Sequence, residues 1–289
     1  MKNPLSGFSW GKRTYIMGII NVTPDSFSGD GLLKQADIAN SALEQARQFV
    51  SAGADILDIG GESTRPGAEP VEEEEELRRV LPVIQAIAMA DLGIPISLDS
   101  YRATVAEAGL LAGVNWLNDI WGLKADPKIA GVASRYRVPL ILMHNRSQPG
   151  NASLASQLSA YPLGTEYRDL VADVKTELLQ SITLAHQAGI PDDLIIIDPG
   201  IGFGKTVAQN IELVARLDEF RSLGYPVLLG PSRKSFIGKT LDLPPDQRLE
   251  GTLAAVGVGI MRGVDIVRVH DVKEVVRFTR MTDAIVRAM

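Results

Sequence analysis

The chain of 289 residues contains no cysteine. This absence excludes a disulfide scaffold, a thiolate zinc site and a cysteine nucleophile. Only three histidines are present, at His144, His186 and His270, so a histidine-rich metal centre is not expected. An essential metal would therefore be a hard cation bound by oxygen atoms.

The chain also lacks an excess of positive charge and a long apolar run. It has 29 basic and 35 acidic residues, for a net charge of −6, whereas nucleic-acid-binding proteins usually present a basic face. No stretch approaches the roughly 20 apolar residues of a membrane span, and the amino-terminal residues lack the apolar segment of a secretory signal. We therefore expect a cytoplasmic protein that binds neither nucleic acid nor a membrane.

Short apolar segments alternate with longer amphipathic segments along the whole chain. The apolar segments predict strands at 14–20, 55–59, 94–98, 115–117, 138–143, 194–197, 226–229 and 265–269. The others predict helices at 36–51, 72–89, 103–111, 127–135, 166–188, 210–223, 247–261 and 272–288. The stretch 147–164, rich in Ser, Ala, Gly and Pro, is predicted to be a long loop.

Several predicted strands, such as 194–197, are apolar on both faces, which is typical of a parallel sheet covered by helices. Eight strand–helix units in a chain of this length favour a (β/α)8 TIM barrel. We expect one domain over residues 1–289. A doubly wound sheet stays open as an alternative, because alternation by itself does not close a barrel.

Polar residues follow all eight predicted strands, where a barrel of this kind carries its chemistry. Helix capping accounts for some Asp, Asn and Ser residues at such places, but it does not account for Lys234, Arg268 or His270. The residues at the strand ends include Asn21, Asp99, Asn118, Met143, Asp198, Lys234, Arg268 and His270.

These residue types divide into two groups. Asp99, Asn118 and Asp198 can accept and donate the hydrogen bonds of a flat heterocycle that has an amino group and ring nitrogens. The second group combines Lys234 and Arg268 with His270 and Asn21, and such a set suits a phosphate. The sequence therefore predicts a ligand with a nitrogen-rich ring at one end and an anion at the other.

Five segments together resemble dihydropteroate synthase, and the resemblance extends from about residue 14 to the last helix. They are NVTPDSFS at 21–28, DIGGESTRPG at 58–67, DPGIGFGK at 198–205, SRKSFIG at 232–238 and RVHDV at 268–272. The resemblance implies a TIM barrel that joins p-aminobenzoate to 6-hydroxymethyl-7,8-dihydropterin diphosphate. The products would be 7,8-dihydropteroate, an intermediate of folate biosynthesis, and pyrophosphate.

The resemblance also implies a role for each matching residue. Asp99, Asn118 and Asp198 would bind the pterin ring, Lys234 its oxo and N5 edge, and Met143 and Arg268 its two faces. Asn21 would bind Mg²⁺, and Asn21, Arg268 and His270 would bind the diphosphate. The p-aminobenzoate pocket would consist of Thr64, Arg65, Pro66, Phe203, Lys234 and Ser235, with Phe27 helping to close it. A homodimer and competition by sulfonamides, which mimic p-aminobenzoate, are also implied.

The implied reaction is dissociative: pyrophosphate leaves first, and the electron-rich pterin ring stabilises the resulting cation. A loop at 21–31 would then exclude water. The chain departs from the family pattern in this loop, because the second loop acid, Asp30, stands one place later than usual. Its family role near the metal is therefore not carried over to this chain.

Three other functions stay open on the sequence alone. They are a methyltetrahydrofolate methyltransferase of the same pterin-binding fold, a Schiff-base aldolase that uses Lys234, and a non-catalytic pterin-binding protein. The segment 200–206 is not expected to be a nucleotide P-loop, since the pattern requires glycine at position 199, which is proline. Lys205 is then expected at the surface, His144 in a structural hydrogen bond, and Asp58 and Glu62 as supports of the loop after the second strand.

Overall fold

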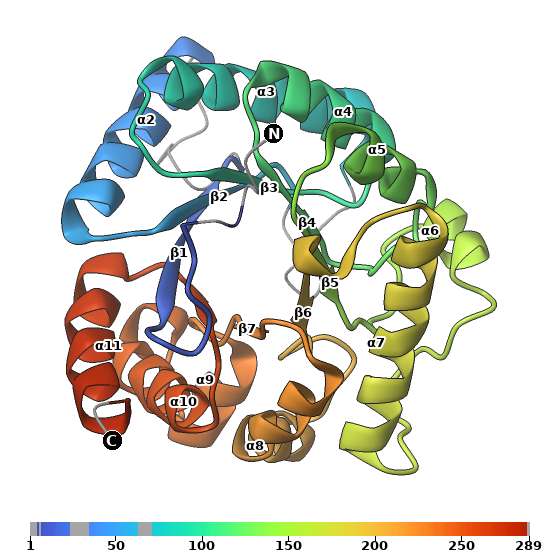
Figure 1. Cartoon of the computed structure of the whole chain (residues 1–289), viewed down its shortest axis with the longest axis vertical. Helices are drawn as coiled ribbons and strands as arrows, with labels where there is room; N and C mark the ends of the chain where they lie inside the picture. The colour runs from blue at the N-terminus through green and yellow to red at the C-terminus, as the bar shows by residue number, and fades with distance from the viewer. Residues whose placement is uncertain (1–4, 6, 24–34, 63–70, 288–289) are drawn as a thin grey trace.

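Eight parallel strands form the centre of the computed structural model, which describes residues 5, 7–23, 35–62 and 71–287. Helices surround them on the outside (Figure 1). The strands are β1 (Tyr15–Asn21), β2 (Ile56–Gly60), β3 (Ile96–Asp99), β4 (Trp116–Asp119), β5 (Leu140–Met143), β6 (Ile195–Asp198), β7 (Leu228–Leu229) and β8 (Ile266–Val269). The α-helices are α2 (Gln35–Ala52), α3 (Glu73–Met89), α4 (Ala103–Ala112), α5 (Lys128–Tyr136), α6 (Ala152–Gln157), α7 (Leu170–Gln187), α8 (Val207–Ala215), α9 (Ser235–Leu241), α10 (Leu249–Met261) and α11 (Val272–Val286).

The sheet closes into a barrel. Its strand order is β6-β5-β4-β3-β2-β1-β8-β7, with every pair parallel. The remaining gap between β6 and β7 is bridged where Ile197 pairs with Val227, and the Ile197 N–H donates to Pro226 O at 3.0 Å. The predicted TIM barrel is thereby confirmed, and the doubly wound alternative is wrong.

The alternation of side chains along each strand builds two different layers inside the barrel. The layer near the amino-terminal ends is apolar, and Phe8 and Trp10 pack against it. Two residues further along the strands, the same alternation turns polar side chains inward. The apolar layer consists of Tyr15, Met17, Ile56, Trp116, Ile141, Ile196, Leu228 and Ile266. The polar layer above it contains Asp58, Asn118, Asp198 and Arg268.

The intervening strand residues face the helices and form the larger hydrophobic core. Leu57, Leu117 and Ile197 are fully buried members of it. Side-chain caps define where helices begin: Asp169 accepts from Ala172 N at the start of α7, and Thr206 and Gln209 form a capping box at α8. This outer core holds the strand ends in place, so the polar layer rests on a rigid support.

Three local predictions differ from the structure. The 147–164 stretch contains the short helix α6, because the Asn151 side chain caps it by accepting from Leu154 N at 2.7 Å. The predicted 210–223 helix is instead α8 followed by a 3-10 helix at Leu217–Leu223. Helix α9 was not predicted. Within the described ranges, no helix is both long and apolar enough to cross a membrane.

Candidate active site

Carboxylate and amide side chains from neighbouring strands meet at the carboxyl-terminal end of the barrel. Asp99 ends β3, Asn118 lies in β4 and Asp198 ends β6. In the strand register Asp99 pairs with Asn118, and Asp198 pairs with Met143. The Asn118 and Asp198 side chains are buried, and the Asp99 side chain is 12% exposed. The structure therefore brings together the group that the sequence predicted for a nitrogen-rich ring.

Arg268 reaches from β8 into the middle of these acids. Its Nε donates to Asp58 Oδ2 at 2.5 Å and its Nη2 donates to Asp99 Oδ2 at 2.6 Å. Acidic and cationic groups thus share one end of the barrel, as expected from the sequence. They are interleaved, however, whereas the sequence predicted acids on one side and cations on the other.

Asp58 is a member of this site that the sequence interpretation missed. Its Oδ2 accepts from Asn118 Nδ2 at 3.1 Å as well as from Arg268. Among the described residues, its Oδ1 is buried with no hydrogen-bond partner. The prediction that Asp58 supports the loop after β2 is therefore wrong, whereas Glu62 does pair near that loop, with Arg102 at 2.8 Å. Asp58 follows Ile56 by two residues, as Asp198 follows Ile196, and that shared spacing could have identified it.

Burial shifts the protonation equilibria of this cluster. Burial raises the pKa of Asp99 to about 7, against the lowering effect of the Arg268 charge. The pKa of Asp198 is also raised by burial, although Gly200 N donates to its Oδ1 at 2.7 Å. Burial lowers the pKa of Lys234 to about 8, and the nearby Asp198 carboxylate opposes that shift. Near neutral pH the site therefore combines a partly protonated Asp99 with a charged Lys234.

Lys234 lies against the loop that follows β6. Its Nζ is 3.9 Å from the centre of the Phe203 ring, a cation–π distance. A Cβ atom placed on Gly202 would come within 3.0 Å of Lys234 Cδ, so glycine permits this close approach. Met143 and Phe203 belong to a cluster of buried apolar side chains next to the acids, together with Tyr101, Ile120 and Trp121. Ser235 is exposed at the start of α9.

His270 and Asn21 lie together at the ends of β8 and β1. The His270 ring places Nδ1 2.9 Å from Ser232 Oγ and Nε2 3.5 Å from Asn21 Nδ2. The Ser232 hydroxyl also accepts from the His270 backbone N–H at 3.2 Å. Because the amide nitrogen of Asn21 can only donate, its contact with Nε2 makes Nε2 the acceptor, and Nδ1 then carries the ring hydrogen and donates to Ser232 Oγ.

Lys205 is half-buried and bonded rather than a free surface lysine, so that sequence prediction is wrong. Its Nζ lies inside the loop after β6, within hydrogen-bond distance of His144 Nδ1 and of two backbone carbonyls. His144 is fully buried and also bonds Glu177 Oε2 at 3.2 Å. The prediction of a structural hydrogen bond at His144 is confirmed.

Some predicted site residues lie outside the described residues. They are Phe27, Thr64, Arg65 and Pro66, together with the displaced loop acid Asp30. In the part of the chain that the structure describes, no group of three or more carboxylate or histidine side chains could hold a metal ion. Asn21 offers one amide oxygen at this end of the barrel. Such a donor suits Mg²⁺, which retains waters and binds substrate phosphates rather than a protein cage.

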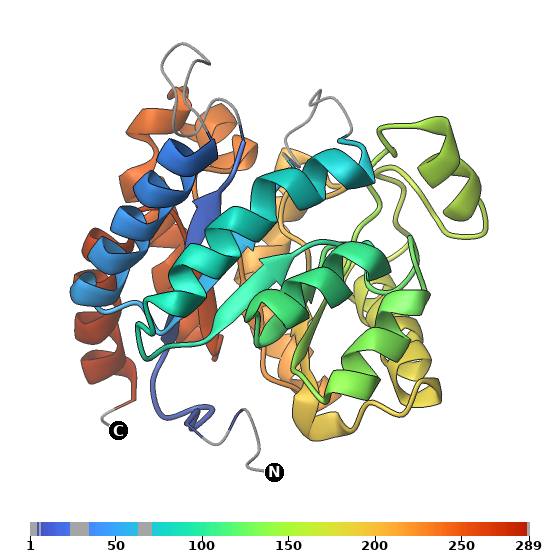
Figure 2. The same ribbon diagram turned by 90° about the horizontal axis from the view of Figure 1, so that it is seen from above.

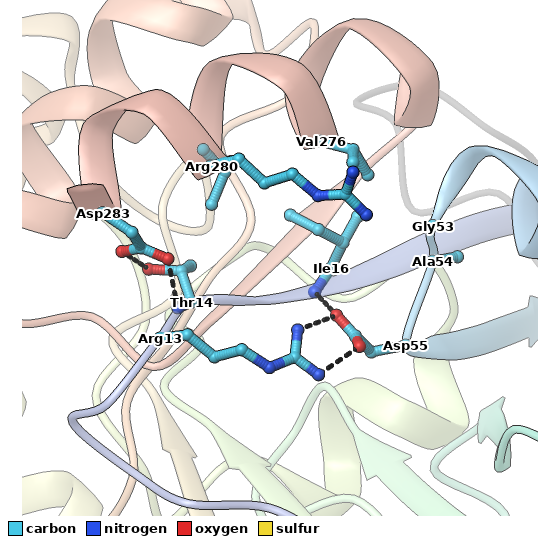
Figure 3. A pocket seen from close by; sticks show the side chains of 10 residues that line it. Arg13, Thr14, Ile16, Gly53, Ala54, Asp55, Val276, Arg280 and Asp283 are labelled. Carbon is cyan, nitrogen blue, oxygen red and sulfur yellow. Dashed lines mark hydrogen bonds and ion pairs between the residues drawn. The ribbon is translucent and has the colours of Figure 1, made fainter.

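A cavity of about 500 Å³ lies elsewhere, between the amino-terminal ends of β1 and β2 and helix α11 (Figure 3). Three of its charged side chains, Arg13, Asp55 and Asp283, pair with one another or with nearby residues. Arg13 contacts Asp55 at 2.6 Å, and the Thr14 N–H donates to Asp283 at 2.7 Å. These pairs stabilise the amino-terminal end of the barrel. We therefore place the candidate active site in the polar layer and not in this cavity.

Comparison with protein families decides which enzymes the chain belongs with. The model of the pterin binding enzymes matches residues 17–270. The chain belongs to the pterin-binding enzyme family. Within this family, it is 49% identical to the dihydropteroate synthase of Bacillus subtilis over 96% of this chain and 91% of the relative.

Solved structures of the pterin-binding family superpose on nearly the whole chain. Dihydropteroate synthase from Clostridium difficile, solved in the presence of pteroic acid, is 49% identical with a TM-score of 0.88, covering 97% of this chain and 99% of that one. The Xanthomonas albilineans enzyme with 4-aminobenzoic acid is 40% identical with a TM-score of 0.85, covering 96% and 95% of the two chains. The chain is accordingly a transferase of the dihydropteroate synthase type.

Proposed function

We propose that residues 1–289 form one catalytic domain that condenses 6-hydroxymethyl-7,8-dihydropterin diphosphate with p-aminobenzoate. The products are 7,8-dihydropteroate and pyrophosphate. One observation carries the proposal: Asp58, Asp99 and Asn118 converge with Arg268 on one end of a barrel that is closely related to dihydropteroate synthases. That set combines acceptors for a pterin's N–H groups with a cation for its phosphates.

In the proposed complex the pterin ring lies in the polar layer. Asp99 and Asp198 accept from its N–H groups, and Asn118 both donates and accepts. Lys234 donates to the oxo and N5 edge, while Met143 and the Arg268 guanidinium pack on the two faces of the ring. For this, Arg268 has to turn part of its guanidinium away from Asp99, which it contacts at 2.6 Å.

The diphosphate extends from the ring toward His270 and Asn21 at the ends of β8 and β1. Arg268 and a ring N–H of His270 donate to its oxygens, and Asn21 would contribute an oxygen ligand for Mg²⁺. When bound, Mg²⁺ neutralises charge on the departing pyrophosphate. The p-aminobenzoate then lies against Phe203, Lys234 and Ser235, with Thr64, Arg65, Pro66 and Phe27 completing the pocket.

Departure of pyrophosphate before attack, an SN1-like order, fits the charges of the site. Asp58, Asp99 and Asp198 border the same space, and fixed negative charge stabilises a positive centre that develops on the pterin methylene. The neutral amine of p-aminobenzoate is a weak nucleophile and gains most from meeting a preformed cation. The amine loses its extra proton only after the new C–N bond has formed, so no strong general base is needed.

The pH dependence of turnover should follow Lys234. Its pKa is lowered to about 8, so the ammonium is charged below that pH and loses its charge above it. We expect kcat/KM for the pterin diphosphate to decline above about pH 8, because Lys234 no longer donates with full charge. In Lys234→Arg this alkaline decline should disappear, since a guanidinium does not titrate in that range. The same decline in the variant would contradict the assignment.

A pyrophosphate-release assay tests the proposed function directly. The full chain is incubated with the pterin diphosphate, with and without p-aminobenzoate and with and without Mg²⁺. We expect release that requires both additions, with 7,8-dihydropteroate formed in equal amount. Binding of the pterin diphosphate with no release on adding p-aminobenzoate would indicate a non-catalytic pterin-binding protein. Methyl transfer from methyltetrahydrofolate would indicate the methyltransferase.

We also propose that the chain acts in the cytoplasm as a homodimer. The resemblance of nearly the whole chain to dihydropteroate synthases supports this. Size-exclusion chromatography with light scattering measures the oligomeric state, and a mass of one chain at micromolar concentration would contradict the dimer.

A further inference from the structure

The ammonium group of Lys205 is held by three acceptors inside the loop between β6 and α8. Nζ lies 2.9 Å from His144 Nδ1, 2.9 Å from Gly200 O and 3.0 Å from Phe203 O. These contacts match the three hydrogens of an ammonium group. Lys205 therefore joins the end of β5 to both ends of the 200–203 turn.

A second side chain, His144, is in turn held from outside the barrel. Since His144 Nδ1 accepts from Lys205, its Nε2 carries the ring hydrogen and donates to Glu177 Oε2 at 3.2 Å. Burial and the Lys205 charge lower the pKa of His144 to about 3, so the ring is neutral, as this arrangement requires. Glu177 belongs to α7, which packs outside β5 (Figure 1). These contacts therefore link α7, the end of β5 and the loop after β6.

The loop held in this way is tightly wound and close to the site. Gly200, Gly202 and Gly204 all have positive φ, at 72°, 88° and 63°. A Cβ atom on Gly200 would lie 1.7 Å from His144 O, so the turn fits directly against the end of β5. Between these glycines stands Phe203, whose ring faces Lys234 Nζ at 3.9 Å. A small shift of the turn would therefore move the Phe203 ring relative to Lys234.

Other side chains hold other parts of the same loop. Gly202 N donates to Asn210 Oδ1 at 2.6 Å, and Tyr167 OH donates to Gly204 O at 3.0 Å. Lys205 differs from them because it bonds the carbonyl of Phe203 itself. Burial lowers the pKa of Lys205 to about 7, against the raising effect of Asp198 and Glu177. The cost of burying this amine indicates that its three contacts are needed in that place.

We propose that Lys205 is a positioning residue for the arylamine substrate: through its three hydrogen bonds it sets the place of the Phe203 ring beside Lys234. This inference rests on the proposed function, which assigns Phe203 and Lys234 to the p-aminobenzoate pocket. Lys205 does not contact the substrate. Its effect therefore falls on p-aminobenzoate more than on the pterin: Asp99 and Asn118 stand on other strands, and Asp198, whose Oδ1 accepts from Gly200 N, is fixed within β6.

Steady-state pyrophosphate release by Lys205→Met tests the inference, with each substrate varied in turn. Methionine keeps the length of the side chain but cannot donate. We expect KM for p-aminobenzoate to rise about tenfold, the scale of a slightly misplaced binding group, and KM for the pterin diphosphate to change by less than about threefold. A sulfonamide used as a binding probe should lose affinity in parallel with p-aminobenzoate.

The matched control is Lys124→Met. Lys124 is buried, whereas Lys205 is half-buried, and it lies 3.8 Å from Glu177, but its ammonium faces the Tyr161 ring rather than the loop after β6. Both variants remove a lysine near Glu177, so both should unfold at a lower temperature. Only Lys205→Met should change KM for p-aminobenzoate. An equal rise in the Lys124 variant would overturn the proposal, because it would show a general loss of stability.

A double-mutant cycle with Phe203→Ala tests whether Lys205 acts through that ring. If it does, Phe203→Ala combined with Lys205→Met should raise KM for p-aminobenzoate no more than Phe203→Ala alone. Additive effects, or an unchanged KM in Lys205→Met, would overturn the inference. If Lys205→Met does not fold, Lys205→Gln, which retains an N–H donor, takes its place and should show a smaller rise. Absence of pyrophosphate release by the unmodified chain would instead overturn the proposed function.

Discussion

Arg268→Ala should weaken binding of the pterin diphosphate by about 2–4 kcal/mol, or roughly 30- to 1000-fold. The side chain contacts Asp58 at 2.5 Å and Asp99 at 2.6 Å. Its removal takes away the cation proposed for the diphosphate and also leaves two neighbouring carboxylates without their shared partner. Isothermal titration calorimetry with the pterin diphosphate measures the loss.

The lower end of the barrel supplies the control for this experiment. Arg13 forms a similar pair with Asp55, at 2.6 Å, beside the amino-terminal ends of the strands. Arg13→Ala should lower the unfolding temperature slightly and leave the affinity for the pterin diphosphate unchanged. An affinity of Arg268→Ala within about threefold of the unmodified chain would contradict the anion role of Arg268.

Asp58→Asn should reduce kcat/KM about 10- to 100-fold, the range for weakening hydrogen bonds to a charged group. One carboxylate oxygen of Asp58 holds both Arg268 and Asn118. The asparagine amide has the same shape as the carboxylate but no charge. Its NH₂ group would lie beside the N–H donors of Arg268 and Asn118, which offer it no acceptor. Steady-state kinetics should show the loss for the pterin diphosphate, to which both Arg268 and Asn118 are proposed to bind.

A second readout separates this electrostatic role from simple damage to the fold. The Asp58 charge helps to raise the pKa of Asp99, which burial raises to about 7. In Asp58→Asn the pKa of Asp99 should therefore fall, and the acidic limb of the pH profile should move to lower pH. Asp55→Asn, at the other end of the barrel, should leave the profile unchanged. An unmoved acidic limb in Asp58→Asn would argue against coupling of the two acids.

Much of the site could be predicted because parallel strands bring their carboxyl ends together. Asp99, Asn118 and Asp198 were identified from position alone, since each stands at the end of an apolar strand. Strand alternation then turns their side chains inward. The same reasoning predicted the barrel, although the two-residue β7 is far shorter than the predicted 226–229 strand.

The remaining features depend on how far a side chain reaches, and the position of a residue in the sequence does not determine which partners it contacts. The strand-end pattern placed Arg268 in a cationic group apart from the acids, yet its length lets it cross to Asp58 and Asp99. Lys205 follows a glycine-rich turn that usually lies at a surface, but the turn folds back over it and buries the ammonium. Local propensity likewise did not reveal α6, which depends on the Asn151 cap within a polar stretch.

The apolar layer around Trp116 has a consequence for the timing of turnover. It fills the barrel beneath the acids, and Phe8 and Trp10 pack against it from below (Figure 2 shows this amino-terminal segment at the bottom). With the substrates placed as proposed, both enter from the same side, and the one bound nearest the filled end is expected to arrive first. Once joined to the arylamine, it cannot be exchanged until the whole product departs. An ordered sequence of substrate binding and product release is therefore expected from the packing of a few tryptophan, tyrosine and isoleucine side chains.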